Sequence, residues 1–341
     1  MTIAVDFDTV SIVFGDRPAS ALPLMDAGQT RPEIQEATGQ VLGVHDCKLQ
    51  VKTGEILVLM GLSGSGKSTL LRAVNGLNPV VRGAVRVNDG QDMVDITHAD
   101  APTLRRMRRR HVAMVFQQFG LLPWRTVAEN VGLGLELDGM AKSERADKVA
   151  AQLDLVHLSD WADRKVGELS GGMQQRVGLA RAFATEAPIL LMDEPFSALD
   201  PLIRTRLQDE LIELQQKLKR TIIFVSHDLD EAFKIGDRIA IMEGGRIVQC
   251  GTPQEIFSNP INDYVADFVA HMNPLGVLCA RDVMDPATGT PEITVAPDAE
   301  IQSVMETVMQ TGQPVGVMEN GQVVGQITKD GVLAKLLDPR G

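Results

Sequence analysis

The sequence has few cysteines, few aromatic residues and no long apolar run. Its three cysteines, Cys47, Cys250 and Cys279, are widely spaced and odd in number, which fits reduced thiols better than a disulfide framework or a zinc site. The best apolar runs, at 56–62 and 189–192, are far shorter than the roughly 20 residues that a membrane-spanning helix needs. We therefore expect a chain that does not itself cross a bilayer.

Positive charge is also scarce, with 33 Lys and Arg against 45 Asp and Glu and a net charge of −12. Because proteins that bind bulk nucleic acid need a basic face, this balance argues against nucleic acid as a partner. The arginine run at 105–110 is a local exception, and a solvated helix face or a protein interface explains it better than phosphate contacts. The amino terminus resembles no signal peptide, so the expected location is cytoplasmic.

Apolar and β-branched runs recur along the chain with helical patterns between most of them. This alternation predicts an α/β fold with a parallel sheet. Strands are expected near 5–14, 41–51, 55–60, 112–116, 189–192, 221–225 and 239–242. The stretch from about 120 to 185 predicts an inserted helical lobe, and residues 16–38 an insertion of short helices and loops. Prolines from Pro274 onward indicate a domain boundary, which divides the chain into 1–272 and 273–341.

A glycine-rich loop follows the apolar strand at 55–60 and precedes a helical pattern. It matches the phosphate-binding pattern G-x4-G-K-S, and its residues are Gly61, Leu62, Ser63, Gly64, Ser65, Gly66, Lys67, Ser68 and Thr69. Glycines let the backbone wrap closely around a polyphosphate, while N–H groups and the start of the helix face the anion. Lys67 is expected to reach the terminal phosphates and Ser68 to ligate Mg²⁺. The alternative, a flexible Gly-Ser loop with an incidental lysine, does not explain the flanking strand and helix.

Two adjacent carboxylates end the apolar run at 189–192. Phosphoryl transfer needs one acid near the metal and one group that activates or orients water. We assign Asp193 to Mg²⁺ and Glu194 to polarising the attacking water. A solvated turn is the alternative, but four apolar residues directly before the pair argue against it.

The segment Leu169 to Gln175 (LSGGMQQ) resembles the signature sequence of the ABC ATPases. The resemblance covers roughly residues 4–270, and it implies a P-loop NTPase fold with a RecA-like parallel sheet, an antiparallel β subdomain and the inserted helical lobe. It also implies ATP as cofactor. Ser170, Gly171 and Gly172 open a helix and would form a second anion cradle. Two copies of the chain are then expected to pair head to tail, each signature closing on the ATP of the other.

Three further residues match functional positions of the family. Gln117 matches the glutamine that joins the metal to the transmembrane partner, Asp200 lies in the loop that links the two nucleotide sites, and His227 matches the histidine at the terminal phosphate. Most members stack adenine on an aromatic residue shortly before the second strand, where this chain has Thr38. We therefore assign adenine stacking to Phe14, at the end of the first strand.

Several segments resemble the branch that imports glycine betaine, proline betaine and choline, with 270–284 most like choline subunits. Choline is ranked first and betaine second. The resemblance implies an integral membrane permease, a periplasmic or extracellular substrate-binding protein, and a peripheral location on the cytoplasmic face of the bacterial inner membrane.

The tail, residues 273–341, resembles a single cystathionine-synthase-type (CBS) motif, a small α+β unit. A docking or dimerisation role is favoured over nucleotide or salt sensing. Its net charge, five negative by sequence count, disfavours docking on anionic lipid.

The rival function is a soluble ABC ATPase that acts on nucleic acid or ribosomes without a permease. Such proteins usually carry two nucleotide domains, zinc fingers or long coiled coils, and the sequence shows none of these patterns.

Overall fold

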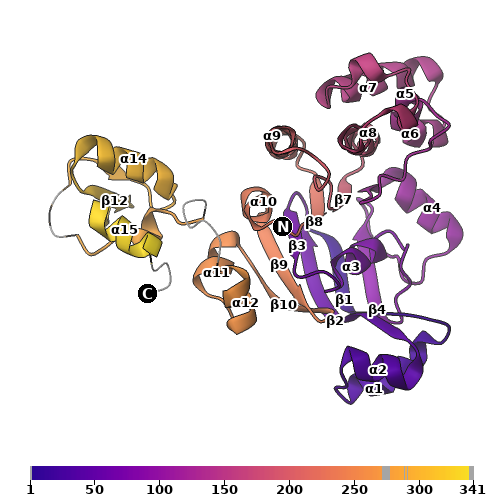
Figure 1. Cartoon of the computed structure of the whole chain (residues 1–341), viewed down its shortest axis with the longest axis horizontal. Coiled ribbons are helices and arrows are strands. Elements are labelled where there is room, and N and C mark those ends of the chain that lie inside the picture. The colour runs from indigo at the N-terminus through magenta and orange to yellow at the C-terminus, as the bar shows by residue number, and fades with distance from the viewer. Residues whose placement is uncertain (1, 271–276, 288, 290, 338–341) are drawn as a thin grey trace. The chain divides into compact units, whose positions relative to one another are not determined.

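The computed structural model describes residues 2–270, 277–287, 289 and 291–337. The chain divides into two compact units, one of Met1–His227 with Ala240–Val248, the other of Asp228–Ile239 with Gln249–Gly341. Figure 1 shows the elements of each unit. Within the described residues, no helix is both long and apolar enough to span a membrane.

The first unit contains an antiparallel sheet of four strands in the order β2-β1-β4-β5. These strands are β1 (Ile3–Phe14), β2 (Val41–Lys52), β4 (Arg82–Asn88) and β5 (Met93–Asp95). The insertion between β1 and β2 forms a 3₁₀ turn, Pro18–Ala21, and the helices α1 (Leu22–Asp26) and α2 (Arg31–Thr38). The expected mixture of short helix and loop at 16–38 is thus confirmed.

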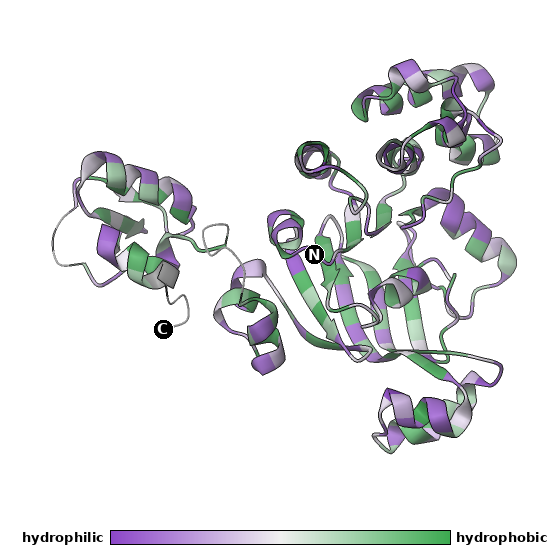
Figure 2. Ribbon diagram, in the orientation of Figure 1, coloured by the Kyte–Doolittle hydropathy of each residue, from purple (hydrophilic) through white to green (hydrophobic). Residues whose placement is uncertain are grey.

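A second sheet has six strands in the order β10-β9-β3-β8-β7-β6, of which the run from β3 to β6 is parallel. Its strands are β3 (Ile56–Met60), β6 (Val112–Val115), β7 (Ile189–Asp193), β8 (Thr221–Val225), β9 (Arg238–Glu243) and β10 (Arg246–Gly251). Every residue of β3, β7 and β8 is buried, which explains why these strands are apolar except for Asp193 at the end of β7 and Thr221 at the start of β8, and mostly green in Figure 2. The predicted parallel sheet is therefore confirmed.

Helices α3 (Lys67–Ala73) and α9 (Pro201–Leu218) follow strands β3 and β7, and α4 (Ala101–Arg110) precedes β6. The arginines of α4 make contacts within the chain: Arg106 with Asp89, Arg108 with the carbonyls of Asn75 and Gly76, and Arg109 with Asp138. Much of the positive charge of α4 is thus paired within the chain, which is compatible with both interpretations of the sequence, a solvated helix face and a protein interface.

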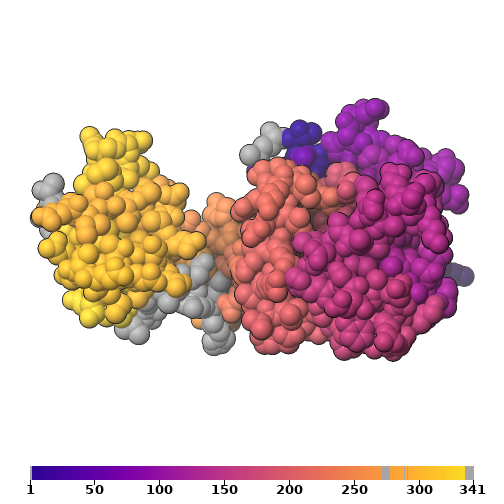
Figure 3. All heavy atoms as spheres, turned by 90° about the horizontal axis from the view of Figure 1, so that it is seen from above, coloured from indigo at the N-terminus to yellow at the C-terminus, as the bar shows by residue number. Residues whose placement is uncertain are grey.

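The helical lobe packs around its own buried apolar cluster, which includes Val131, Leu153 and Val177. Its helices are α5 (Val127–Val131), α6 (Leu133–Leu137), α7 (Lys142–Leu155) and α8 (Gly171–Ala184), with 3₁₀ turns at Ser159–Trp161 and Val166–Glu168. They are grouped in Figure 1 and appear as the magenta surface of Figure 3. The predicted inserted lobe is confirmed.

The second unit contains α10 (Leu229–Ile235), α11 (Pro253–Ser258), α12 (Asp263–Phe268) and α13 (Ala280–Val283). Its tail has a three-stranded sheet, β11 (Thr294–Val295), β12 (Val315–Glu319) and β13 (Gln322–Ile327), with α14 (Ile301–Thr311) and α15 (Lys329–Leu337), drawn in yellow tones in Figure 3. β12 and β13 form the expected hairpin, which turns at Asn320 and Gly321 with positive φ angles. The boundary expected at Pro274 lies outside the described residues, and the division at 272 remains a prediction.

Candidate nucleotide site

The glycine-rich loop joins β3 to α3 and is shaped by glycines with positive φ angles. At Gly61 φ is +137°, and a Cβ there would come within 2.1 Å of the Met242 carbonyl oxygen, so no other residue fits. Lys67 is buried, and its Nζ donates hydrogen bonds to the carbonyl oxygens of Gly61, at 2.8 Å, and Leu62, at 3.0 Å. Burial lowers the pKa of Lys67, while the charges of Glu194 and Asp193 act in the opposite direction.

Asp193, at the end of β7, is fully buried and is held by two side chains of α3. The Ser68 hydroxyl donates to its Oδ1 at 2.6 Å, and the Arg72 guanidinium donates to its Oδ2 at 2.9 Å. A hydroxyl and a carboxylate are oxygen ligands, which Mg²⁺ prefers, and Mg²⁺ commonly takes only one or two protein ligands beside phosphates and water. Two of the three residues assigned to the metal from the sequence, Ser68 and Asp193, thus lie together, whereas the third, Gln117, contacts Glu194. Within the described residues, no group of three or more His, Cys, Asp or Glu side chains could hold a metal.

Glu194 lies at the meeting point of the other predicted catalytic residues. Its Oε2 accepts a hydrogen bond from Gln117 Nε2 at 3.1 Å and lies 3.3 Å from His227 Nδ1. The backbone of Glu194 has φ +49°, a strained conformation for a residue with a side chain, and its N–H donates to the Val225 carbonyl of β8. This backbone conformation and its hydrogen bond fix the direction in which the Glu194 side chain projects from the end of β7.

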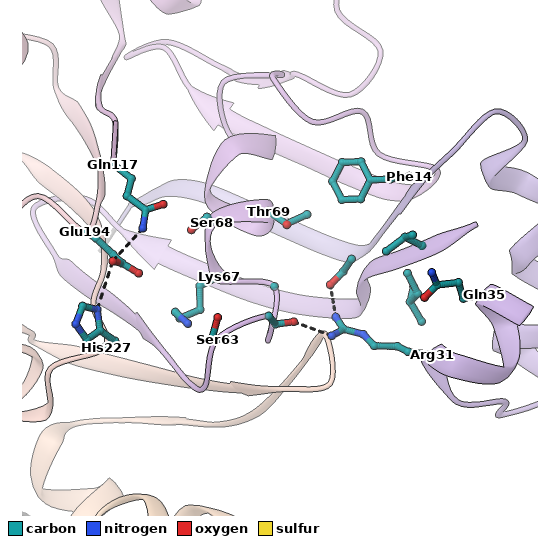
Figure 4. Close-up of a pocket in the computed structure, with 15 residues that line it drawn as sticks. Phe14, Arg31, Gln35, Ser63, Lys67, Ser68, Thr69, Gln117, Glu194 and His227 are labelled. Atoms are coloured by element: carbon teal, nitrogen blue, oxygen red, sulfur yellow. Dashed lines mark hydrogen bonds and ion pairs between the residues drawn. The ribbon is translucent and has the colours of Figure 1, made fainter. Parts of the chain in front are cut away.

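One pocket of about 650 Å³ is lined by Lys67, Ser68, Gln117, Glu194 and His227, together with other residues. Figure 4 shows Gln117, Glu194 and His227 at one end, Phe14, Arg31 and Gln35 at the other, and the loop residues Ser63, Lys67, Ser68 and Thr69 between them. Phe14 is 38% exposed, as a stacking platform should be, and it lies against Gly43, where an added Cβ would meet the ring at 2.8 Å. Thr38 is not among the lining residues.

Some predicted site residues lie outside this pocket. Gly61, Leu62 and Ser65 shape the loop without lining the pocket, and Asp193 reaches it only through Ser68. Ser170, Gly171, Gly172 and Asp200 also lie outside it.

Ser170 and Asp200 are instead seen as helix caps. Ser170 caps α8, where its Oγ accepts from the Met173 N–H, and Asp200 caps α9 in the same way through the Ile203 N–H. Gln175, one turn into α8, donates to the Glu194 carbonyl oxygen and accepts from the Ala198 N–H. Helix α8, which carries the signature sequence, is therefore tied to the backbone just after β7, at the predicted catalytic residue Glu194.

The sequence reasoning missed Arg31, Gln35 and Arg72. Arg72 lies one helical turn after Ser68 on α3, so the i, i+4 spacing could have signalled that both reach the same carboxylate. Arg31 and Gln35 lie in the insertion, for which no motif gave a role.

Known proteins place the chain in a family. Residues 44–197 match the family model described as ABC transporter. The glycine betaine/proline betaine transport system ATP-binding protein ProV of Salmonella typhimurium is 46% identical over 345 residues, covering 100% of this chain and 84% of the relative. The trimethylamine N-oxide transport system ATP-binding protein TmoW of Ruegeria pomeroyi is 42% identical, covering 95% of this chain and 94% of the relative.

Among solved structures, a dimeric ATP-binding cassette in a post-hydrolysis state, bound to ADP and Pi, is similar. Its TM-score is 0.63 at 29% identity, covering 73% of this chain and 98% of the cassette. The architecture, the pocket and the relatives agree. The chain therefore belongs to the ATP-binding subunits of ABC transporters, in the group of the glycine betaine and proline betaine import systems.

Proposed function

We propose that the pocket binds ATP with Mg²⁺ and that hydrolysis there drives import of a quaternary ammonium compound through a separate membrane permease. One observation carries the proposal: a single pocket brings the phosphate loop, Phe14, Gln117, Glu194 and His227 together from five separate parts of the sequence. ATP would lie along the pocket, with its adenine on Phe14 and its terminal phosphate toward Glu194.

The residues divide the work between holding charge and moving a proton. Lys67, Ser63, Gly64, Gly66, Ser68 and Thr69 would surround the phosphates, and the loop N–H groups would face their negative charge. Ser68, Asp193 and Gln117 would hold Mg²⁺, which when bound neutralises charge on the phosphates.

The remaining steps fall to two side chains that are already in contact. Glu194 would orient the attacking water and accept its proton, and His227, next to the same carboxylate, would contact the terminal phosphate. Gln117, which donates a hydrogen bond to Glu194, would connect the metal site to the permease.

The signature residues Ser170, Gly171 and Gly172 would act on the ATP of a second copy of the chain, and Asp200 would link the two sites. Two observations support this: the signature lies outside the chain's own pocket, and the similar solved cassette is a dimer.

The permease would contact the helical lobe near Trp124, whose side chain is 68% exposed beside a pocket of about 620 Å³. Arg125, Arg145 and Lys165 alternate there with Glu129 and Glu136. An exposed tryptophan with a charged rim is typical of a protein interface. The complex would also include a periplasmic or extracellular substrate-binding protein, and this subunit would lie peripherally on the cytoplasmic face of the bacterial inner membrane.

The solute is the least constrained part of the proposal, because this subunit does not contact it. The names of the relatives support glycine betaine and proline betaine, and the length match with the trimethylamine N-oxide subunit supports that smaller amine oxide as a second candidate. Choline, ranked first on the resemblance at 270–284, stays a candidate.

The tail would be a single CBS-like unit with a docking or dimerisation role. Its αβ arrangement of β11–β13 with α14 and α15 is compatible with such a motif. Because CBS units usually work in pairs, the second member would come from the other copy of the chain.

The test is ATP hydrolysis by the complex of this chain with its permease and binding protein, in vesicles. We expect choline, glycine betaine or proline betaine to stimulate hydrolysis several-fold, and the Lys67→Ala variant to lack activity. Stimulation by trimethylamine N-oxide alone would move the solute to the second candidate. Hydrolysis that persists in Lys67→Ala would contradict the nucleotide site itself.

A further inference from the structure

The insertion at 16–38 has no role in the mechanism above, yet one of its helices reaches the nucleotide pocket. Arg31 and Gln35, one turn apart on α2, both line it beside the phosphate loop and Phe14 (Figure 4). The inference drawn from them rests on the proposed function of this pocket as an ATP site.

Arg31 joins two parts of the pocket wall that are distant in sequence. Its Nη1 donates to the carbonyl oxygen of Gly64, at the tip of the phosphate loop, at 2.7 Å, and its Nη2 donates to the carbonyl oxygen of Gly43 in β2 at 2.5 Å. A planar guanidinium can hold two acceptors in fixed directions, which a lysine ammonium does less well.

The contact with Gly64 completes a set of bonds around the loop. The Ser65 N–H donates to the Leu62 carbonyl, and the Ser65 carbonyl accepts from the Gly245 N–H. The carbonyls of Gly61 and Leu62 accept from Lys67. The peptide between Gly64 and Ser65 is thus held at both its oxygen and its nitrogen. Since peptide units are planar, this fixes the orientation of the loop tip that faces the phosphates.

The space around Arg31 is also closed. A Cβ at Gly245 would come within 2.5 Å of Arg31 Nη2, and a Cβ at Gly66 within 2.7 Å of the Gly43 carbonyl oxygen. The packing around Arg31 therefore leaves no room for a side chain at Gly66 or at Gly245.

Helix α2 is anchored firmly enough to hold this position. Its first turn is closed by a capping box between Thr30 and Glu33, and Gly39 ends it with φ +68°. Ile34 is fully buried in an apolar cluster with Val13, Met25 and Leu42, so the helix packs against both strands that flank the insertion.

We propose that α2 is an integral wall of the nucleotide pocket and that Arg31 is a positioning residue for the phosphate loop. Arg31 acts through Gly64 and does not itself take part in hydrolysis. Gln35, whose amide both donates and accepts, offers the same wall a polar group toward the bound nucleotide.

The test compares Arg31→Ala and Arg31→Lys with Glu36→Ala in the assembled complex, with MgATP as the probe. Glu36 is exposed on the same helix and does not line the pocket, so it is a matched control. We expect Arg31→Ala to raise KM for ATP about ten-fold with kcat within about two-fold, because the loop is less well placed but the catalytic groups remain. Arg31→Lys should fall between it and the wild type, and Glu36→Ala should match the wild type.

An unchanged KM in Arg31→Ala would overturn the proposal. If the melting temperature of that variant were also lower, Arg31 would only stabilise the fold. If Arg31→Ala fails to fold, the KM of Arg31→Lys decides in the same way. Lys67→Ala, measured in parallel, separates failure of the proposed function from failure of the role of Arg31. Normal ATP binding by Lys67→Ala would contradict the nucleotide site itself. Loss of ATP binding in Lys67→Ala together with a wild-type KM in Arg31→Ala would contradict only the role of Arg31.

Discussion

The phosphate loop and the signature turn are two helix starts with the same chemistry and different surroundings. Both place glycine and serine residues at the start of a helix, α3 in one case and α8 in the other. The phosphate loop lies in a pocket with Glu194, Gln117 and His227, while Ser170 and Gly171 lie outside it. One copy of the chain therefore has the phosphate loop in its own pocket and the signature turn outside it, which fits the proposal that the signature turn acts on the ATP of a second copy.

The largest effect expected concerns the catalytic end of the pocket. Glu194→Gln keeps the size of the side chain but cannot accept a proton, so ATP hydrolysis should fall about 10³-fold while ATP still binds. In the proposed dimer, where closure would depend on bound ATP, the variant should accumulate as an ATP-bound dimer, measurable by size-exclusion chromatography. Turnover near that of the wild type would remove Glu194 from the role of base.

A substitution in the signature turn should also lower hydrolysis but, unlike Glu194→Gln, should prevent the dimer from closing. Ser170→Arg places a bulky cation at the turn and removes the cap of α8, so hydrolysis should fall about 10²-fold through loss of dimer closure. ATP binding by the separate subunit, measured by calorimetry, should stay within about two-fold. Loss of binding together with hydrolysis would contradict the division between the two helix starts.

Arg72 should affect stability more than binding. Arg72→Ala leaves the buried Asp193 carboxylate without its cationic partner, so the free energy of unfolding should fall by about 2 kcal/mol in urea. The value is less than for a fully buried pair because Arg72 is partly exposed. Addition of MgATP should recover part of the loss, since Asp193 then gains the metal. An unchanged urea midpoint would show that the ion pair contributes nothing.

The smallest effect is expected from the tail. Deletion of residues 280–341 should leave ATP turnover at low salt within about two-fold of the wild type, because the catalytic residues all lie before it. A changed dependence of turnover on salt or nucleotide concentration would favour the sensing role of the tail over the docking or dimerisation role. Identical salt and nucleotide profiles in both proteins would leave the tail without a regulatory role.

The sequence predicted the parts of the site that depend on local patterns. The loop at 61–69, the acids at 193 and 194 and the strand before them are contiguous, and buried parallel strands read as apolar runs. The sequence also pointed to Phe14, because the insertion displaced the usual aromatic position; Phe14 lines the pocket, and its role in adenine stacking stays a prediction.

Contacts between segments that are distant in the sequence could not be predicted from it. The bonds from Arg31 to Gly64 and Gly43 join an insertion to a loop, and no motif relates them. The same holds for Gln175, which ties the signature helix to Glu194 through a backbone carbonyl. Such contacts depend on how elements pack, which side-chain periodicity does not encode.

A mixing experiment tests the central claim, that the site is complete only between two copies of the chain. Lys67→Ala has no working phosphate loop and Ser170→Arg no working signature, so each alone should be inactive. In a mixed dimer, the loop of one chain and the signature of the other form one intact site. The account predicts that an equal mixture recovers up to about a quarter of wild-type hydrolysis, since half the dimers are mixed and each has one site. A mixture as inactive as its two components would contradict it.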